Sequence, residues 1–189
     1  MIGWVVLILL VLVLIGIGLY TVLIYNGFVA MKNEVDKAWS NIDVLLKQRF
    51  DELPKLINVC EGYMQHEQRT LEAVIRARSQ VAGARGTEEK LQAQNLLTDT
   101  LRSLFAVAER YPELKADAVF QRLGLRISEL EDQIADRREL FNEAVNLYNI
   151  RLEQFPDLIV ARMFNFTGRT LWKIDPAHRQ DVEVKFQHA

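Results

Sequence analysis

Residues 5–24 are VVLILLVLVLIGIGLYTVLI, and this stretch determines how the rest of the chain is organised. Sixteen of its twenty residues are Leu, Ile or Val, and no Asp, Glu, Lys or Arg occurs before Lys32. Twenty residues of α-helix rise about 30 Å, which matches the hydrocarbon core of a bilayer. A single segment can cross that core only as a helix, because a helix pairs its own backbone groups. The stretch therefore predicts a membrane-spanning helix within an N-terminal anchor, residues 1–31.

Two other interpretations of this stretch fit the residues less well. A cleaved signal peptide has a basic start, a shorter apolar core and a small-residue cleavage site, and residues 25–30 (YNGFVA) offer no good site. A buried core helix would keep a polar face over this length. Aromatic residues suit the two interfaces, and the glycines allow close helix approach. The anchor residues assigned on this basis are Trp4, Gly16, Gly18, Tyr20 and Tyr25.

The charges that flank the stretch predict its orientation. Lys32, Lys37, Lys47 and Arg49 come after it, whereas only the α-amine precedes it. The positive-inside rule therefore places the C-terminal part in the cytoplasm rather than the periplasm.

Composition excludes several classes of protein. The chain carries 23 Lys and Arg against 25 Asp and Glu, and charges of both signs are interspersed. Without a basic block, nucleic acid is not an expected partner. The single cysteine, Cys60, excludes an internal disulfide framework, and its place among apolar residues predicts a small core side chain.

Beyond the anchor, apolar residues recur every three or four positions, which is typical of helices with one buried face. We expect the first helix to continue from the anchor to the glycines at 83–86. Pro54 lies inside it and should kink it, because proline lacks the amide that a helix needs. Thr87 is the expected N-cap of a second helix over about 88–111, which Tyr111 and Pro112 end.

The third expected helix begins near 114 or 116 and has a near-heptad apolar repeat, as in coiled coils. Phe155 and Pro156 end it, and a short fourth helix covers 158–164. The prediction is thus an all-α fold: a transmembrane helix that continues into a bundle over 32–164, with three long helices and a short fourth. The tail, 165–189, is weakly patterned, and we expect it to be loosely packed or extended.

Asp43 lies one residue from the first apolar stripe. It can pair with Lys47 four residues later, or reach an asparagine beside the stripe of the third helix. The asparagines in reach are Asn142, Asn146 and Asn149. Such a group is either a polar site for a partner or ligand, or a polar lock that fixes helix register, and we favour the lock.

Residues that would carry metal or nucleophilic chemistry do not form a recognisable set. His66 precedes Glu67, but a di-iron bundle needs Glu-x-x-His on two helices, and position 63 is Tyr. The other histidines, His178 and His188, lie in the tail. Cys60 has no histidine at a spacing that forms an obvious dyad. We therefore predict no catalytic residue, metal site or cofactor.

An ordered series of short motifs resembles the LemA family of bacterial membrane proteins along nearly the whole chain. The motifs are Tyr25-Asn26, Ala38-Trp39-Ser40, Ile42-Asp43-Val44, Leu46-Lys47 with Arg49, Leu53-Pro54, His66-Glu67, Tyr111-Pro112, Arg137-Arg138 with Asn142, Tyr148-Asn149 and Phe155-Pro156. Lys55 departs from the pattern, where the family usually has Asn. The residues in these motifs that we consider structural or interaction candidates are Trp39, Asp43, Lys47, Arg49, Pro54, His66, Tyr111, Pro112, Asn142, Asn149, Phe155 and Pro156.

The resemblance implies a left-handed antiparallel helical bundle on a membrane stalk, in the inner membrane of a bacterium. It implies no reaction, and its relatives include a magnetosome membrane protein associated with forming that compartment. We therefore expect a non-catalytic scaffold at the bilayer that forms a homo-oligomer or holds protein partners, and that could shape the membrane. One alternative is an adaptor or sensor for a membrane protease or signalling partner. Another is an enzyme that uses Asp43, Lys47, Arg49 and His66.

Overall fold

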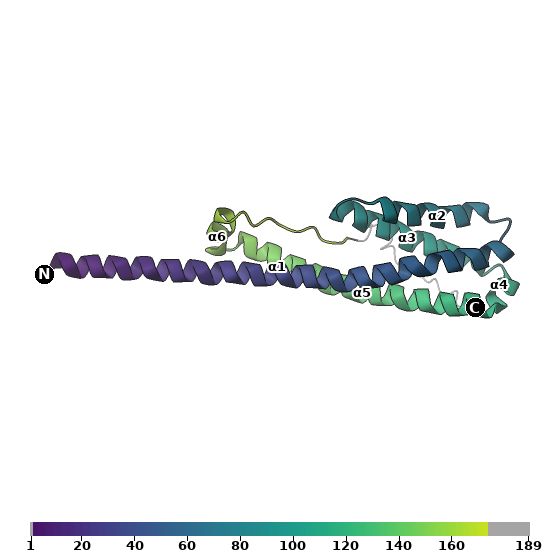
Figure 1. Ribbon diagram of the computed structural model, residues 1–189, viewed down its shortest axis with the longest axis horizontal. Helices are drawn as coiled ribbons and strands as arrows, with labels where there is room; N and C mark the ends of the chain where they lie inside the picture. The colour runs from purple at the N-terminus through teal and green to yellow at the C-terminus, as the bar shows by residue number, and fades with distance from the viewer. Residues whose placement is uncertain (1, 174–189) are drawn as a thin grey trace, which may run out of the picture. The chain divides into compact units, whose positions relative to one another are not determined.

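The computed structural model describes residues 2–173, and every regular element in that range is a helix. The helices are α1 (Ile2–Tyr63), α2 (Gln68–Gly83), α3 (Thr87–Ala108), α4 (Pro112–Ala116), α5 (Ala118–Glu153) and α6 (Asp157–Met163) (Figure 1). The prediction of an all-α fold with a long apolar N-terminal helix is confirmed. The described residues divide into a first unit, 2–44 with 135–171, and a second unit, 45–134 with 172–173. Helices α1 and α5 each contribute one part to each unit.

The apolar stretch forms the beginning of α1 in the first unit. It is long and apolar enough to cross a membrane, and none of its most apolar window is buried by the described residues. A core helix of the same composition would be covered by its neighbours. The stretch is therefore a candidate membrane span and not part of the packed core.

Packing in the first unit begins where the apolar stretch ends. Ile24 and Phe28 are buried, and the Phe28 ring meets Tyr148 of α5 edge-on at 6.3 Å between centroids. Phe166, which comes after α6, stacks on the same ring at 5.0 Å. Further along, Trp39 packs on Phe141 at 5.6 Å. An aromatic core thus joins α1 to α5 and α6.

The second unit has one continuous apolar core. The α1 stripe meets apolar side chains of α2, α3, α4 and α5, and α2 packs along α3 (Figure 1). The buried residues that form it include Leu53, Leu56, Cys60, Met64, Leu71, Val74, Leu97, Leu101, Leu104, Leu114 and Ile127. Apart from Leu114 of α4, these are positions that the three-and-four-residue spacing predicts.

The prediction that the first helix runs to residue 83 is wrong. Helix α1 ends at Tyr63, and a turn through Met64 to Glu67 leads into α2. The turn is closed by the Glu67 amide, which donates to the Met64 carbonyl at 2.9 Å. Met64 and Leu71 are both buried and are seven residues apart, so the apolar stripe keeps its phase across the turn. Spacing alone therefore gives no signal for this break.

Two other helix boundaries differ in detail from the sequence predictions. Gly86, not Thr87, is the N-cap of α3, and its φ of +85° is a conformation that glycine adopts without strain. The third predicted helix is two elements, α4 and α5, separated by Asp117. Pro54 lies inside α1, which continues through it. The kink expected there stays a prediction.

The described part of the tail has neither helix nor strand, but it is not loosely packed. Trp172 is buried, and its indole Nε1 donates to Asn95 Oδ1 at 2.8 Å. The Asn95 amide in turn donates to the Lys173 carbonyl at 2.9 Å. Both tail histidines, His178 and His188, lie outside the described residues.

Asp117 caps α5 and ties its start to the end of α1. Its Oδ1 accepts from the amides of Val119 and Phe120 at 2.8 and 2.9 Å, and its Oδ2 accepts from the Tyr63 hydroxyl at 3.1 Å. These are the bonds of a helix N-cap. The Phe120 amide is the main reason that the pKa of the Asp117 carboxyl lies below its ordinary value, and the Val119 amide and Tyr63 hydroxyl lower it further.

We predict that Asp117→Ala lowers the Tm of the protein, whereas Asp117→Asn, which can still cap the helix, lowers it less. Because the folded-state pKa is lowered, the charge contributes stability above the ordinary pKa, and this contribution is lost as the pH falls below about 4. The Asn variant should therefore lose less of its stability between pH 5 and pH 3 than the parent protein. Thermal unfolding monitored by circular dichroism measures both effects, with Asp132→Ala on the exposed face as control. An unchanged Tm for Asp117→Ala would contradict the capping role.

Candidate functional site

The most unusual side chain of the second unit is Arg49 of α1, whose charged group is completely enclosed. Its guanidinium donates to Glu131 of α5, to Gln94 Oε1 and, at 2.8 Å, to Thr98 Oγ1 of α3. The Thr98 hydroxyl donates onward to the second oxygen of Glu131 at 3.0 Å. We call these four residues the Arg49 cluster. It joins three helices through charge-assisted hydrogen bonds.

The local sequence explains why an arginine is buried here. Arg49 lies three residues after Leu46 and four before Leu53, so the helical repeat places it on the buried face of α1. Burial of a guanidinium is costly unless the charge is paired and its donors are bonded, and here Nε alone has no partner among the described residues. The arrangement is suited to fixing the register of α1, α3 and α5. It is not suited to reaching a ligand in solvent.

Sequence reasoning identified Arg49 but missed its partners. The side chain of Glu131 is only 24% exposed and pairs with Arg49, a pairing that the sequence analysis did not predict. One signal in the sequence could have identified Glu131 as a partner. It lies four residues after buried Ile127 and three before buried Ile134, so the helical repeat places it on the buried face of α5. Gln94 interrupts the α3 stripe in the same way, seven residues before Leu101. A buried polar cluster is therefore present, but with residues other than those we named around Asp43. Its role in fixing helix register stays a prediction.

The lock predicted around Asp43 is not formed as expected. Asp43 is exposed, and Lys47 pairs with Asp51 at 3.0 Å and not with Asp43. Asn149 instead holds the chain after α6, because its side chain exchanges two 2.8 Å hydrogen bonds with the backbone of Arg169. Asn142 is half-buried on α5. These side chains have structural contacts and do not gather into a catalytic group.

His66 and Cys60 occupy different environments. His66 is exposed in the turn between α1 and α2. Cys60 is buried in the core, and burial raises the pKa of its thiol to about 12. A thiol with that pKa is not a nucleophile at neutral pH. Within residues 2–173, no three His, Cys, Asp or Glu side chains gather where they could hold a metal ion.

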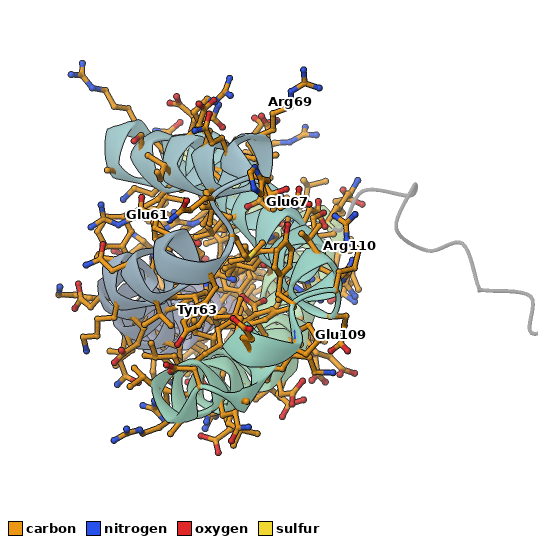
Figure 2. All side chains as sticks on the ribbon, turned by 90° about the vertical axis from the view of Figure 1, so that its right-hand side faces the viewer. Glu61, Tyr63, Glu67, Arg69, Glu109 and Arg110 are labelled. Atoms are coloured by element: carbon orange, nitrogen blue, oxygen red, sulfur yellow. The ribbon has the colours of Figure 1, made fainter. Side chains whose placement is uncertain are left out.

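A polar surface covers one end of the second unit, where Figure 2 shows Glu67 and Arg110 near one another. Glu67 Oε1 accepts from the Arg110 guanidinium at 2.8 Å and from the Tyr111 hydroxyl at 3.2 Å. Lys115 of α4 pairs with Glu109. Burial raises the pKa of the Tyr111 hydroxyl, and its bond to Glu67 adds to that rise. The pairs connect the α1–α2 turn to the junction of α3 and α4, where Tyr111 and Pro112 begin α4.

An apolar groove of about 500 Å³ runs between α1 and α5 in the first unit. Its lining includes Leu140 and Leu147, which are 50% and 52% exposed. We call it the first-unit groove, and the side chains that line it are Glu34, Lys37, Ala38, Asn41, Arg137, Leu140, Glu143, Ala144 and Leu147. Each helix contributes positions three, four and seven residues apart, which form one face.

The remaining predicted residues lie on α1 and at the junction of α5 and α6. Trp39 and Pro54 are half-buried on α1. Phe155 is 81% exposed in the turn between α5 and α6, and Pro156 is the N-cap of α6. The exposed apolar part of α1 carries the anchor residues Trp4, Gly16, Gly18, Tyr20 and Tyr25.

We predict that Glu131→Ala destabilises the protein by about 3 kcal/mol, because removal of one partner leaves a buried charge uncompensated. The measurement is denaturant unfolding of the full chain in detergent. The matched control is Glu129→Ala two residues away, which removes an exposed pair with Arg126 and should cost less than about 1 kcal/mol.

The double variant Arg49→Leu/Glu131→Leu should recover much of the loss, because two apolar side chains replace a charged pair that was costly to desolvate. A Glu131→Ala variant as stable as the Glu129→Ala control would contradict the importance of the pair.

Comparison with known proteins identifies a matching family and several similar proteins. The model of the LemA family matches residues 38–186. Magnetosome protein MamQ 2 of Paramagnetospirillum magneticum is 26% identical over 179 residues, with 81% of this chain and 66% of the relative covered. Protein LemA of Metamycoplasma hominis is 26% identical over 163 residues, with 84% of this chain and 73% of the relative covered.

Magnetosome protein MamQ of Magnetospirillum gryphiswaldense is also 26% identical, over 158 residues, with 70% of this chain and 58% of the relative covered. The chain therefore spans two thirds or less of the length of these magnetosome relatives. The names of the relatives and the exposed apolar part of α1 both fit a membrane location. Because the family model covers well over half of the chain, the protein belongs to the LemA family.

Proposed function

We propose that the protein is a non-catalytic scaffold that is anchored in a bacterial inner membrane by residues 5–24 and associates with copies of itself. The observation that carries the proposal is the exposed apolar beginning of α1, which continues without a break into the packed part of the first unit. Leu, Ile and Val favour insertion by about 0.3 to 0.6 kcal/mol each, so the sixteen in this stretch contribute roughly 5 to 10 kcal/mol.

The charges after the span determine the proposed orientation. Lys32 and Lys37 come within the first turns beyond the apolar stretch, and Lys47 and Arg49 lie further along. The positive-inside rule supports a cytoplasmic location for both units. Within the first unit, α1 would then leave the bilayer as a stalk that α5 and α6 brace.

The first-unit groove supports self-association. Its lining carries Glu34 and Glu143 together with Lys37 and Arg137, so it presents two charges of each sign beside its apolar side chains. A second copy related by a two-fold axis could place each acidic residue beside a basic one. Burying exposed Leu140 and Leu147 would supply the apolar contribution to such an interface.

The relatives support a role in membrane organisation. Three of the curated proteins that the chain resembles are named as magnetosome proteins. In a ring or cluster of anchored copies, the membrane-spanning helices would share one tilt relative to the bilayer. A shared tilt is one way in which such an assembly could bend a membrane.

Enzymatic activity has less support from the described residues. Arg49 is completely buried, and its guanidinium is already hydrogen-bonded to Glu131 and to the neutral side chains of Gln94 and Thr98. Lys47 pairs with Asp51 on an exposed helix face, and His66 lies in an exposed turn. An enzyme requires polar groups that converge on an accessible pocket.

The test is the mass of the full-length protein extracted in mild detergent, measured by light scattering with correction for bound detergent. We expect a protein mass that is a multiple of the 21.8 kDa chain. Leu147→Glu introduces a charge into the first-unit groove and should reduce the mass to that of one chain.

The matched control is Leu125→Glu, at a leucine that is 69% exposed on the part of α5 in the second unit. It should leave the mass unchanged. A monomeric parent protein would contradict self-association and would favour the adaptor or sensor alternative. An oligomer that persists in Leu147→Glu would show that the contact lies elsewhere.

A further inference from the structure

The short helix α6 has an exposed apolar side that its own unit does not cover. Four large apolar side chains of α6 and its flanking residues are 48% to 81% exposed: Phe155, Ile159, Met163 and Phe164. Val160 and Ala161 are buried on the opposite side. The helix is therefore apolar on both the packed and the outward side, which is unusual for a helix that faces only water.

Contacts within the first unit place α6 at the end of the apolar stretch. The Phe164 ring packs on Tyr25 with 4.8 Å between centroids, and Phe166 lies 5.6 Å from the same ring. Tyr25 comes directly after Ile24, the last residue of the stretch. Figure 1 shows α6 beside α1 at the end of α5. If residues 5–24 fill the hydrocarbon core, the level of Tyr25 is the level of the lipid headgroups.

Two polar contacts hold α6 at this level. Arg151 of α5 donates to Asp157, the first residue of α6, at 2.6 Å. The same guanidinium lies against α1 at Gly27, where a Cβ atom would be 2.5 Å from Nη1. After α6, Asn165 adopts a left-handed conformation with φ of 55°, and the Phe166 amide donates to the Ala161 carbonyl at 2.9 Å. The start of α6 is thereby held against α1, and the chain after α6 folds back on the helix.

We infer that α6 is a membrane-contacting element, whose Ile159, Met163 and Phe164 side chains enter the boundary between the headgroups and acyl chains beside the span. A seven-residue helix is about 10 Å long, so all of α6 lies within the depth to which interfacial helices insert. Arg162, exposed in its last turn, is placed to meet lipid phosphates. The occupant is a bilayer and not a second copy, because the apolar side begins where the span ends.

The inference rests on the proposed membrane anchor, and the two can be tested in one experiment. Full-length protein carrying Met163→Cys, in a Cys60→Ala background, is spin-labelled and reconstituted into phosphatidylethanolamine–phosphatidylglycerol vesicles. The matched control is Val44→Cys, an apolar position of the same unit that is 58% exposed. It lies twenty residues beyond Ile24, about 30 Å along α1. Collision rates with oxygen, which concentrates in lipid, and with a water-soluble nickel chelate report the depth of each label.

We expect the label at 163 to collide several-fold more with oxygen than with nickel, and the label at 44 to show the reverse. A label at 163 that is as accessible to nickel as the label at 44 would overturn the inference, provided that the protein floats with the vesicles. A label shielded from both reagents and broadened by neighbouring spins would assign this side to a second copy and would also overturn it. Protein that does not float with vesicles would refute the anchor itself, and the inference with it.

Discussion

The apolar side chains of residues 5–24 must be removed from water, and the rest of the structure depends on how this is achieved. The stretch has sixteen Leu, Ile and Val side chains, and the described residues bury almost none of them up to Leu23. Each such side chain gains roughly 1.5 to 3 kcal/mol when it leaves water. A chain whose other residues form well-packed units would not keep this surface in water. A bilayer satisfies the requirement, and it explains why burial in the first unit begins at Ile24.

Beyond the anchor, each unit is organised around an arginine that contacts several elements. In the second unit, Arg49 connects α1 to α3 and α5 through Gln94, Thr98 and Glu131. In the first unit, Arg151 lies 5.2 Å from the Phe28 ring and pairs with Asp157. Apolar stripes alone permit helices to slide by a turn, whereas a buried charge with fixed partners does not. We therefore hypothesise that buried Arg49 selects one register for α1, α3 and α5, whose apolar stripes alone would allow several.

Residue spacing predicted the buried faces of the helices, and sequence reasoning failed where spacing carries no signal. The stripes of α1, α3 and α5 were predicted because buried positions such as Ile42, Leu53 and Leu101 recur every three or four residues. The turn after Tyr63 was missed because the buried residues on its two sides keep the helical phase across it. The partners of Arg49 were missed because they come from helices far apart in the chain, although each interrupts an apolar stripe. Burial of Trp172 was missed because its hydrogen-bond partner comes from α3, far earlier in the chain.

The central claim is that the chain stays in the membrane through an uncleaved apolar helix. The most direct test is intact-mass measurement of the protein recovered from cell membranes after washing with alkaline carbonate, which removes peripheral proteins. We expect a full-length chain of about 21.8 kDa in the washed membrane pellet. A shorter product that begins after residue 24 and is released into the wash would contradict the claim, because that result would identify residues 5–24 as a removed targeting segment.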